Sequence, residues 1–205
     1  MLMTSFTHND LDIITNEEVY KGFFKVNKVQ LRFKLFGGGM SAPVFREVAE
    51  RYDAVGVLPY DPETDQVILI EQFRIGAMKA EESPWMLELV AGLIDTQESI
   101  TEVAERELEE EAGLALLDIE PIHDYFPSPG GSSERMHVFC GKVEASNDGL
   151  IFGVDHESED IKVHVLSCDE AFALVKENKV NNAATLIALQ WLMLEKERLR
   201  RVWVS

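Results

Sequence analysis

The segment Ala91–Leu114 constrains the fold of this chain more than any other stretch. Ser99 and Glu102 have the spacing of a capping box, in which each side chain accepts a hydrogen bond from the other residue's backbone N–H. A helix is therefore expected to begin just after Ser99. The residues that follow are mostly strong helix formers, and Gly113 is placed to end the helix. The pattern predicts a loop that leads into a helix rich in carboxylates.

The predicted helix has one apolar stripe when it is wound at about 100° per residue. Glu107 falls within that stripe and Glu111 lies one turn further along it, whereas the other glutamates of this run fall on a solvated side. Two carboxylates in line with a buried stripe repel each other and lose hydration, so they need compensating charge. A hard divalent cation supplies it through oxygen ligands. We expect an Mg²⁺ site here, which three neighbours could orient or extend by hydrogen bonding: Glu98, Arg106 and Glu110.

The N-terminal part of the chain predicts a small antiparallel sheet ahead of the main domain. Three segments alternate apolar and polar residues and read as strands, at 11–20, 23–36 and 43–51. Such a sheet has little core of its own, so it must pack on the main domain of its own chain or on another subunit. We expect two domains, residues 1–50 and residues 51–205.

The main domain predicts a mixed α/β unit with the carboxylate-rich helix between strands. Further strands are expected at 53–60, 66–73, 84–92, 117–128, 136–145 and 161–167, followed by helices at 168–178 and 182–200. This order suits an α/β/α sandwich. Glu88 is a lone acid in an apolar strand, three residues before Ala91, and could line the same site as the helical glutamates.

Composition excludes several classes of partner. The formal net charge of −18 argues against nucleic acid or an anionic membrane surface. The two cysteines lack the spacing of a metal site and are too few for a disulfide framework. The sequence shows no signal-peptide pattern and no apolar run long enough to span a membrane, so a reducing cytoplasm is the expected location.

The residues from Gly92 to Leu114 also match a known pattern, G-x5-E-x7-R-E-U-x-E-E-x-G-U, where U is a bulky aliphatic residue. This is the Nudix box, and the chain resembles a Nudix hydrolase, which splits a nucleoside diphosphate linked to another group. The resemblance implies that Glu107 and Glu111 bind Mg²⁺, with Mn²⁺ as an alternative and more than one ion per site. It also implies a metal ligand in the backbone carbonyl of Ala91.

Further segments resemble the bacterial ADP-ribose pyrophosphatase branch of this family: SPGGSSER at 128–135, ESEDIKVHV at 157–165 and NNAATLIALQWL at 181–192. In that branch a proline follows the box by about fifteen residues, and Pro129 is fifteen residues past Leu114. The resemblance implies hydrolysis of ADP-ribose to AMP and ribose 5-phosphate. It also implies a homodimer in which the N-terminal sheet is exchanged between subunits.

The resemblance implies a role for each matching residue. Hydrolysis needs a base, for which the acidic loop offers Glu157 and Glu159; by resemblance Glu157 is the general base and Glu159 a metal-associated acid. Phe23 and Phe24 resemble the aromatic pair that meets adenine, although core packing explains at least one of them equally well. Other substrate contacts are implied in the N-terminal sheet, at Arg46, Glu47 and Arg51. The catalytic domain would add Arg74, Leu93, Ser128, Pro129, Gly130 and Glu134.

Two other functions are compatible with these motifs. Another Nudix hydrolase would act on nucleotide sugars, dinucleoside polyphosphates or oxidised nucleotides. A non-catalytic sensor would bind ADP-ribose to regulate a partner, but such proteins tend to lose acids of the box and to carry an extra domain. The box acids are intact here, so the sequence favours an enzyme.

Overall fold

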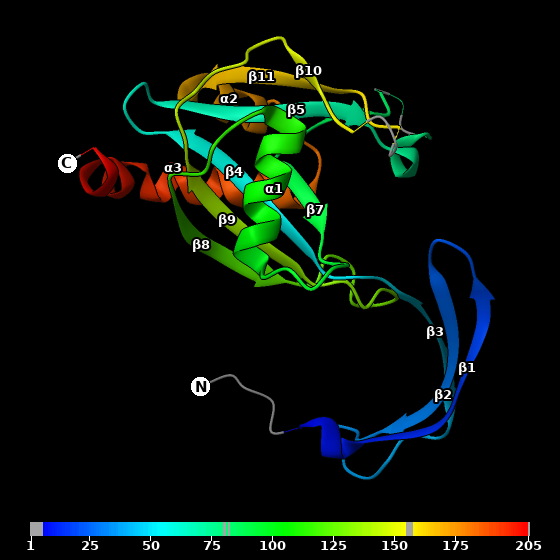
Figure 1. Cartoon of the computed structure of the whole chain (residues 1–205). Coiled ribbons are helices and arrows are strands. Elements are labelled where there is room, and N and C mark those ends of the chain that lie inside the picture. Colours follow the sequence, from blue (N-terminus) through cyan, green and yellow to red (C-terminus); the bar gives the residue numbers. More distant parts are fainter. Residues whose placement is uncertain (1–5, 80, 82, 155–157, 205) are drawn as a thin grey trace. The chain divides into compact units, whose positions relative to one another are not determined.

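The computed structural model describes residues 6–79, 81, 83–154 and 158–204. Its chain divides into two compact units (Figure 1). One consists of Met1–Tyr52, described from residue 6, together with Phe126–Glu134. The other consists of Asp53–Tyr125 and Arg135–Ser205. No helix among the described residues is long and apolar enough to cross a membrane.

The first unit is a three-stranded antiparallel sheet in the order β1-β2-β3. Its strands are β1 (Leu11–Lys21), β2 (Lys25–Phe33) and β3 (Val44–Glu50), as the alternation of the sequence predicts. Backbone hydrogen bonds from Ala49 to Gly131 and from Ser133 to Ala49 join the segment 126–134 to β3. Within its described residues no apolar side chain is buried, so this sheet has no core layer of its own.

The second unit is built on a sheet of eight strands among its described residues, with the main order β10-β11-β5-β4-β9-β8. The strands are β4 (Ala54–Asp61), β5 (Gln66–Phe73), β6 (Trp85–Glu88), β7 (Val90–Leu93), β8 (Asp118–Tyr125), β9 (Met136–Lys142), β10 (Ile151–Phe152) and β11 (Ile161–Ser167). β4 lies parallel to β9, in a register that pairs Ala54 with Met136 and Tyr60 with Lys142. The other pairings are antiparallel.

The chain switches strand partner at Leu89. β4 and β5 pair directly only at Tyr60–Val67 and Asp61–Gln66; beyond that point β6 pairs with β5, and β7 pairs with β4. The single strand predicted over 84–92 is therefore wrong. The buried hydroxyl of Thr185 accepts the Leu89 N–H at 2.8 Å, so Leu89 makes its hydrogen bond outside the sheet. The two short strands meet at this break.

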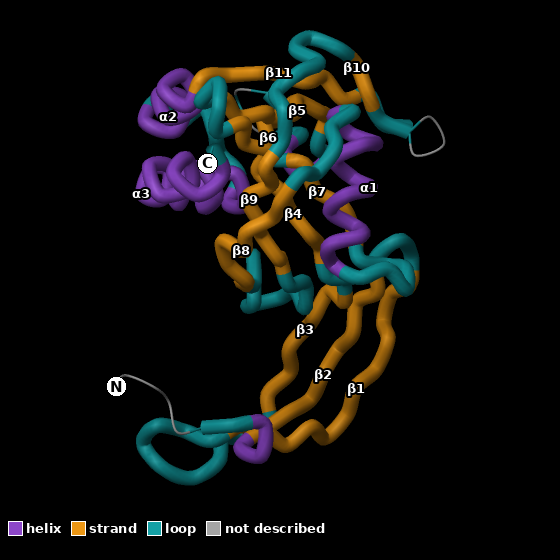
Figure 2. Tube along the Cα trace, turned by 60° about the vertical axis from the view of Figure 1, so that its left-hand side comes forward, coloured by secondary structure: helices purple, strands orange, loops and turns teal. Residues whose placement is uncertain are grey.

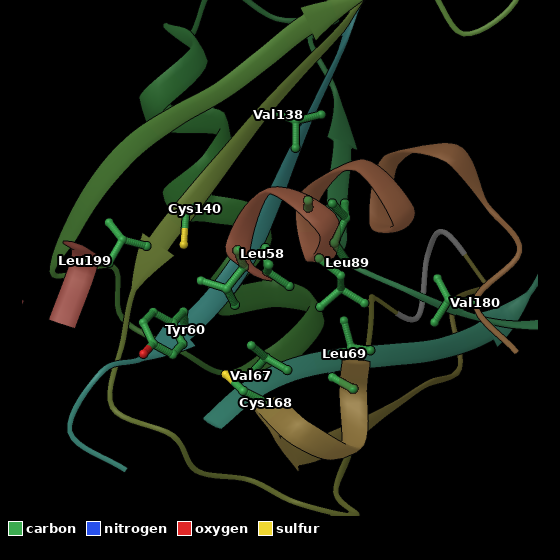
Figure 3. Close-up of a cluster of buried hydrophobic side chains, with 14 of the residues drawn as sticks. Leu58, Tyr60, Val67, Leu69, Leu89, Val138, Cys140, Cys168, Val180 and Leu199 are labelled. Carbon is green, nitrogen blue, oxygen red and sulfur yellow. The ribbon is translucent and has the colours of Figure 1, made fainter. Parts of the chain in front are cut away.

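Helices cover both faces of the main sheet (Figure 2). α1 (Ile100–Ala112) packs on one face through a buried cluster that includes Val55, Ile68 and Leu108. α2 (Cys168–Lys176) and α3 (Ala183–Trp203) cover the other face. The core on that side includes Leu58, Leu69 and the cysteines, both of which are free thiols (Figure 3). The predicted α/β/α sandwich with an N-terminal antiparallel sheet is confirmed.

Candidate active site

Helix α1 is fixed at both ends as its sequence predicts. Ser99 Oγ accepts the Glu102 N–H at 3.3 Å, and Glu102 Oε2 accepts the Ser99 N–H at 2.7 Å. Gly113 ends the helix in the left-handed region, with φ of 62°. The caps fix where α1 begins and ends, and its apolar stripe fixes its rotation: Val103, Ala104 and Leu108 are buried, and the two carboxylates of the stripe face the sheet.

Glu111 is the most deeply buried acid of the helix, with only 2% of its surface exposed. Its Oε2 accepts the backbone N–H of Ala91 on β7 at 2.9 Å. The pKa of Glu111 is raised to about 8, mainly by burial. The hydrogen bond from Ala91 lowers the pKa in part, whereas the charges of Glu107 and Glu159 raise it. A buried carboxylate held at one oxygen has its second oxygen free to bind a cation.

Glu107 lies one turn earlier and packs directly on Gly92. A Cβ atom on Gly92 would lie 1.8 Å from Glu107 Oε1, so any other residue at position 92 would displace this carboxylate. Burial raises the pKa of Glu107 to about 7, although the ion pair with Arg106 opposes the shift. The first glycine of the box is therefore required by the close approach of a carboxylate to the backbone.

Arg106 organises the other acids of the box. Its Nη1 atom donates to Glu107 Oε1 and to Glu110 Oε2, both at 2.8 Å, and its Nε lies 3.3 Å from both carboxylate oxygens of Glu98. The sequence predicted that these residues would orient the metal-binding pair by hydrogen bonding, and the structure places Arg106 against Glu107. The guanidinium also balances part of the negative charge of the group.

The segments on both sides of β10 are attached to the C-terminal end of α1. Gly153 donates its N–H to Glu110 O at 3.1 Å, and the Asn147 side chain donates to the carbonyls of Ala112 and Gly113 at 2.9 and 3.0 Å. The sequence patterns identify neither of these contacts. A helix end whose carbonyls need donors is the signal that could have identified that asparagine.

Glu159 belongs to the same electrostatic group as the helical pair. Its Oε2 accepts the Val154 N–H at 3.2 Å, and its negative charge contributes to the raised pKa values of both Glu107 and Glu111. Gly153 has φ of 109°, and a Cβ there would lie 2.7 Å from the Cβ of Glu159. The predicted base, Glu157, lies outside the described residues.

Two further predicted residues lie near this group, Arg74 directly after β5 and Glu88 at the end of β6. Arg74 Nε donates to Glu88 Oε2 at 2.6 Å, and the charge of Arg74 also lowers the pKa of Glu111. Glu88 thus forms an ion pair that the sequence did not identify. Leu93 pairs with Ala54 in the sheet, and its side chain packs on the α2 and α3 side, away from α1.

The remaining predicted residues lie in the first unit. Phe23 and Phe24 form an edge-to-face pair with ring centroids 5.0 Å apart, and neither is buried, so the core-packing interpretation is wrong for both. The Arg51 guanidinium lies 4.8 Å from the Phe24 ring centroid and pairs with Glu134 at 2.9 Å. Arg46 donates a hydrogen bond from its guanidinium to the carbonyl oxygen of Phe45, and Glu47 lies opposite Lys28 in the sheet. Ser128, Pro129 and Gly130 lie in a turn.

The chemistry of the donor set fits a divalent cation. Glu107, Glu111 and Glu159 offer carboxylate oxygens whose charges repel one another, and a hard cation relieves that repulsion. Among the described residues no three acidic, histidine or cysteine side chains yet form a complete metal-binding set. In this structure Glu107 Oε1 is held by Arg106 Nη1 at 2.8 Å.

The comparison with protein families agrees with this geometry. Residues 50–190 match the model of the NUDIX domain, and the chain belongs to the Nudix family. The family resemblance noted in the box is thereby confirmed. Since this match spans α1 and the main sheet, the carboxylate pair lies in the part of the chain that defines the family.

Within the family the chain is similar to curated enzymes over nearly its whole length. It is 46% identical to an ADP-ribose pyrophosphatase of Escherichia coli strain K12, covering 98% of this chain and 97% of that protein. It is 41% identical to an ADP-ribose pyrophosphatase of Haemophilus influenzae, with 97% and 93% covered. It is 34% identical to a GDP-mannose pyrophosphatase of Pectobacterium atrosepticum, with 88% and 92% covered.

A solved structure shares the fold. The crystal structure of an ADP compounds hydrolase matches with a TM-score of 0.73 and 24% sequence identity, covering 99% of this chain and 100% of that one. The match extends over both units of the chain, including the N-terminal sheet.

Proposed function

We propose that this Nudix enzyme hydrolyses the pyrophosphate bond of ADP-ribose, giving AMP and ribose 5-phosphate, with Mg²⁺ as its cofactor. The observation that carries the proposal is the pair of buried carboxylates, Glu107 and Glu111, in a chain that matches ADP-ribose pyrophosphatases over nearly its full length. Dependence on a divalent metal is general among Nudix hydrolases.

Residues of the second unit would hold the metal and the phosphates. Glu107 and Glu111 bind the cation, with Glu159 and the Ala91 carbonyl as further ligands. When bound, Mg²⁺ neutralises phosphate charge and polarises the phosphorus centre. Arg74 supports a phosphate oxygen by charge-assisted hydrogen bonding, and Arg106 keeps the acids of the box in place.

The chemical step requires a base that the described residues do not include. Glu157 would take a proton from the attacking water as the water oxygen forms a bond to phosphorus. The bond from that phosphorus to the bridging oxygen then breaks, and the bridging oxygen leaves with the second phosphate. Glu159 would help to hold the metal, so the two acids of the loop would have separate roles.

The first unit would recognise the adenosine part of the substrate. Its aromatic pair is exposed, with 82% of the Phe23 surface accessible, and an exposed aromatic suits stacking on a base. Because this unit has no core layer, we propose that it is exchanged in a homodimer and supplies Arg46, Glu47 and Arg51 to the partner's catalytic unit. The two buried free thiols agree with a reducing compartment such as the cytoplasm.

The relationship to GDP-mannose pyrophosphatases favours one alternative, a hydrolase of nucleotide sugars. Both substrates place a pyrophosphate between a nucleoside and a sugar, so the metal site would serve either. The difference must lie in the contacts to the base and the sugar, which is why substrate preference is measured directly.

A substrate panel tests the proposal. ADP-ribose, ADP-glucose, GDP-mannose and a dinucleoside polyphosphate are compared in Mg²⁺ with wild type, Glu111→Gln and Glu157→Gln. We expect ADP-ribose to be preferred with AMP as product, and each variant to lose at least about 100-fold in kcat. Glu109→Gln, on the exposed side of α1, is the matched control and should retain full activity. Binding without turnover would favour the sensor, and preference for GDP-mannose would overturn the substrate assignment.

A further inference from the structure

Gln72 on β5 carries a buried donor that nothing in the described structure satisfies. Only 6% of its surface is exposed, and its side-chain Nε2 is buried without a hydrogen-bond partner among the described residues. A buried donor left unpaired destabilises the fold, and such groups are rare in native proteins. The cost is recovered if an acceptor arrives with a ligand.

The position of Gln72 in the sheet places it on the same face as α1. Side chains alternate along a strand, and Ile68 and Ile70 of β5 both pack in the cluster under α1. Gln72 is two residues further on, directly opposite Met86 of β6. On the other edge of β5, the pairing with β11 extends to Lys162, which lies opposite Glu71. Gln72 is therefore level with the first residue of β11.

Ionic groups of the active site lie around this position. Glu88 is opposite Ile70, two residue pairs from Gln72 along β5 and β6 and therefore on the same face, and it is bound to Arg74. Glu159 lies two residues before the start of β11, on the side from which the acidic loop enters. The carboxylates already present are not hydrogen-bonded to the Gln72 amide. The unsatisfied donor therefore fits an additional anionic oxygen.

We propose that Gln72 is a substrate-binding residue whose amide donates a hydrogen bond to a non-bridging oxygen of the pyrophosphate group. This inference rests on the proposed function and adds a contact to the same site. An amide suits the position because it binds an anionic oxygen without adding a charge beside Glu88 and Glu159. A lysine or arginine there would instead pair with those carboxylates and compete with the metal.

The test compares Gln72→Leu with a matched control in the full-length protein. Leucine replaces the amide with an apolar side chain of comparable size and removes both the donor and the acceptor. Gln66→Leu is the control, because Gln66 lies on the same strand and the same face at the opposite end. Three quantities are measured: kcat/KM for ADP-ribose, affinity for an analogue with a methylene group in place of the bridging oxygen, and the melting temperature of the free protein.

We expect Gln72→Leu to lower kcat/KM and analogue affinity by about 10- to 100-fold, as for a hydrogen bond to a charged acceptor. The melting temperature should stay the same or rise, because the variant removes an unpaired buried donor. Gln66→Leu should leave kinetics and analogue affinity unchanged. A purely structural role predicts the reverse pattern, with lowered melting temperature and normal analogue affinity, and would overturn the proposal.

Two further comparisons show which acceptor the Gln72 amide binds and, if a prediction fails, whether the proposed function or only the role of Gln72 is wrong. Calorimetric titration with Mg²⁺ alone should give the same affinity in wild type and Gln72→Leu; weaker Mg²⁺ binding would mean that Gln72 serves a metal-bound water and not a phosphate oxygen. If wild type does not hydrolyse ADP-ribose, the proposed function fails. If wild type and Gln66→Leu hydrolyse it and Gln72→Leu matches them, only the role of Gln72 fails.

Discussion

At the scale of single residues, the protonation of Glu111 connects metal binding to stability. The free protein favours the neutral form, because burial raises the pKa of this carboxyl to about 8 from a usual 4.5. A cation requires the ionised form. With Glu111 as the proposed ligand, metal binding should release a proton at neutral pH, and metal affinity should increase as the pH rises towards 8.

The same shift predicts how the metal-free protein responds to pH. An acid whose pKa is raised by folding stabilises the fold below its unfolded pKa, and this stabilisation is lost as the pH rises through about 8. In EDTA, the melting temperature should fall between about pH 5.5 and about pH 8.5. Glu111→Gln should flatten this dependence and add on the order of 2 kcal/mol at the upper end. Thermal melts check this, and a slope equal to that of Glu109→Gln would contradict it.

Gly92 gives a second prediction, based on the closeness of Glu107. In Gly92→Ala the new Cβ would overlap the carboxylate, so the side chain must move out of its metal-binding position. We expect about a 100-fold loss of kcat, as for a misplacement of about 1 Å, with a small change in melting temperature. Gly37→Ala is the control, since a Cβ there meets nothing within 4 Å. Normal Mg²⁺ affinity and activity in Gly92→Ala would refute the explanation.

At the scale of elements, the break at Leu89 determines where the site forms. β6 carries Glu88 to β5, and β7 carries Ala91 to β4 and beneath Glu111. A continuous strand over the same residues would place Glu88 and Ala91 beside the same neighbouring strand. The hydrogen bond from Leu89 to Thr185 of α3 holds this break in place from the opposite face of the sheet. It therefore keeps Glu88 and Ala91 beside different strands.

Thr185→Val tests this arrangement. Valine has nearly the shape of threonine but leaves the buried Leu89 N–H without its acceptor, at a cost of about 1–3 kcal/mol. Chemical denaturation should show this loss, with unchanged steepness. Thr101→Val on exposed helix surface should lose much less. Equal stability in the two variants would show that the Leu89 N–H has another partner.

Sequence predicted the elements whose causes are local. The capping box of α1, its terminal glycine and the burial of Glu111 follow from spacing along one helix. The break at Leu89, β10 and the attachment of Asn147 to α1 depend on groups far apart in the sequence, which periodicity does not report. The ion pair between Arg74 and Glu88 was not predicted for the same reason, because these residues meet only when β5 and β6 are paired.

At the scale of the whole molecule, the N-terminal sheet needs a covering surface that its own unit does not provide. Many of its apolar side chains are exposed, among them Ile13, Val19 and Phe45. A second copy of the chain would bury them, and the proposed exchange would make each active site depend on both subunits.

Mixing two inactive variants tests the exchange. Arg46→Ala and Glu111→Gln are co-expressed with different tags, so that half of the dimers are mixed. If Arg46 acts in the partner's site, each mixed dimer has one intact site and the preparation should show about a quarter of wild-type activity. If Arg46 acts in its own subunit, no intact site forms. Activity no greater than the sum of the separate variants would rule out the exchange.

The parallel pairing of β4 with β9 bears on how the chain acquires activity as it folds. The two strands begin beside a contact between Asp53 and Arg135, which are 82 residues apart in the sequence, and α1 lies within the intervening segment. Closing so long a loop is slow compared with forming a helix or a hairpin. On refolding, helical signal should therefore return before the capacity to bind metal, because the sheet on which α1 packs is complete only after the two distant parts of the chain have joined.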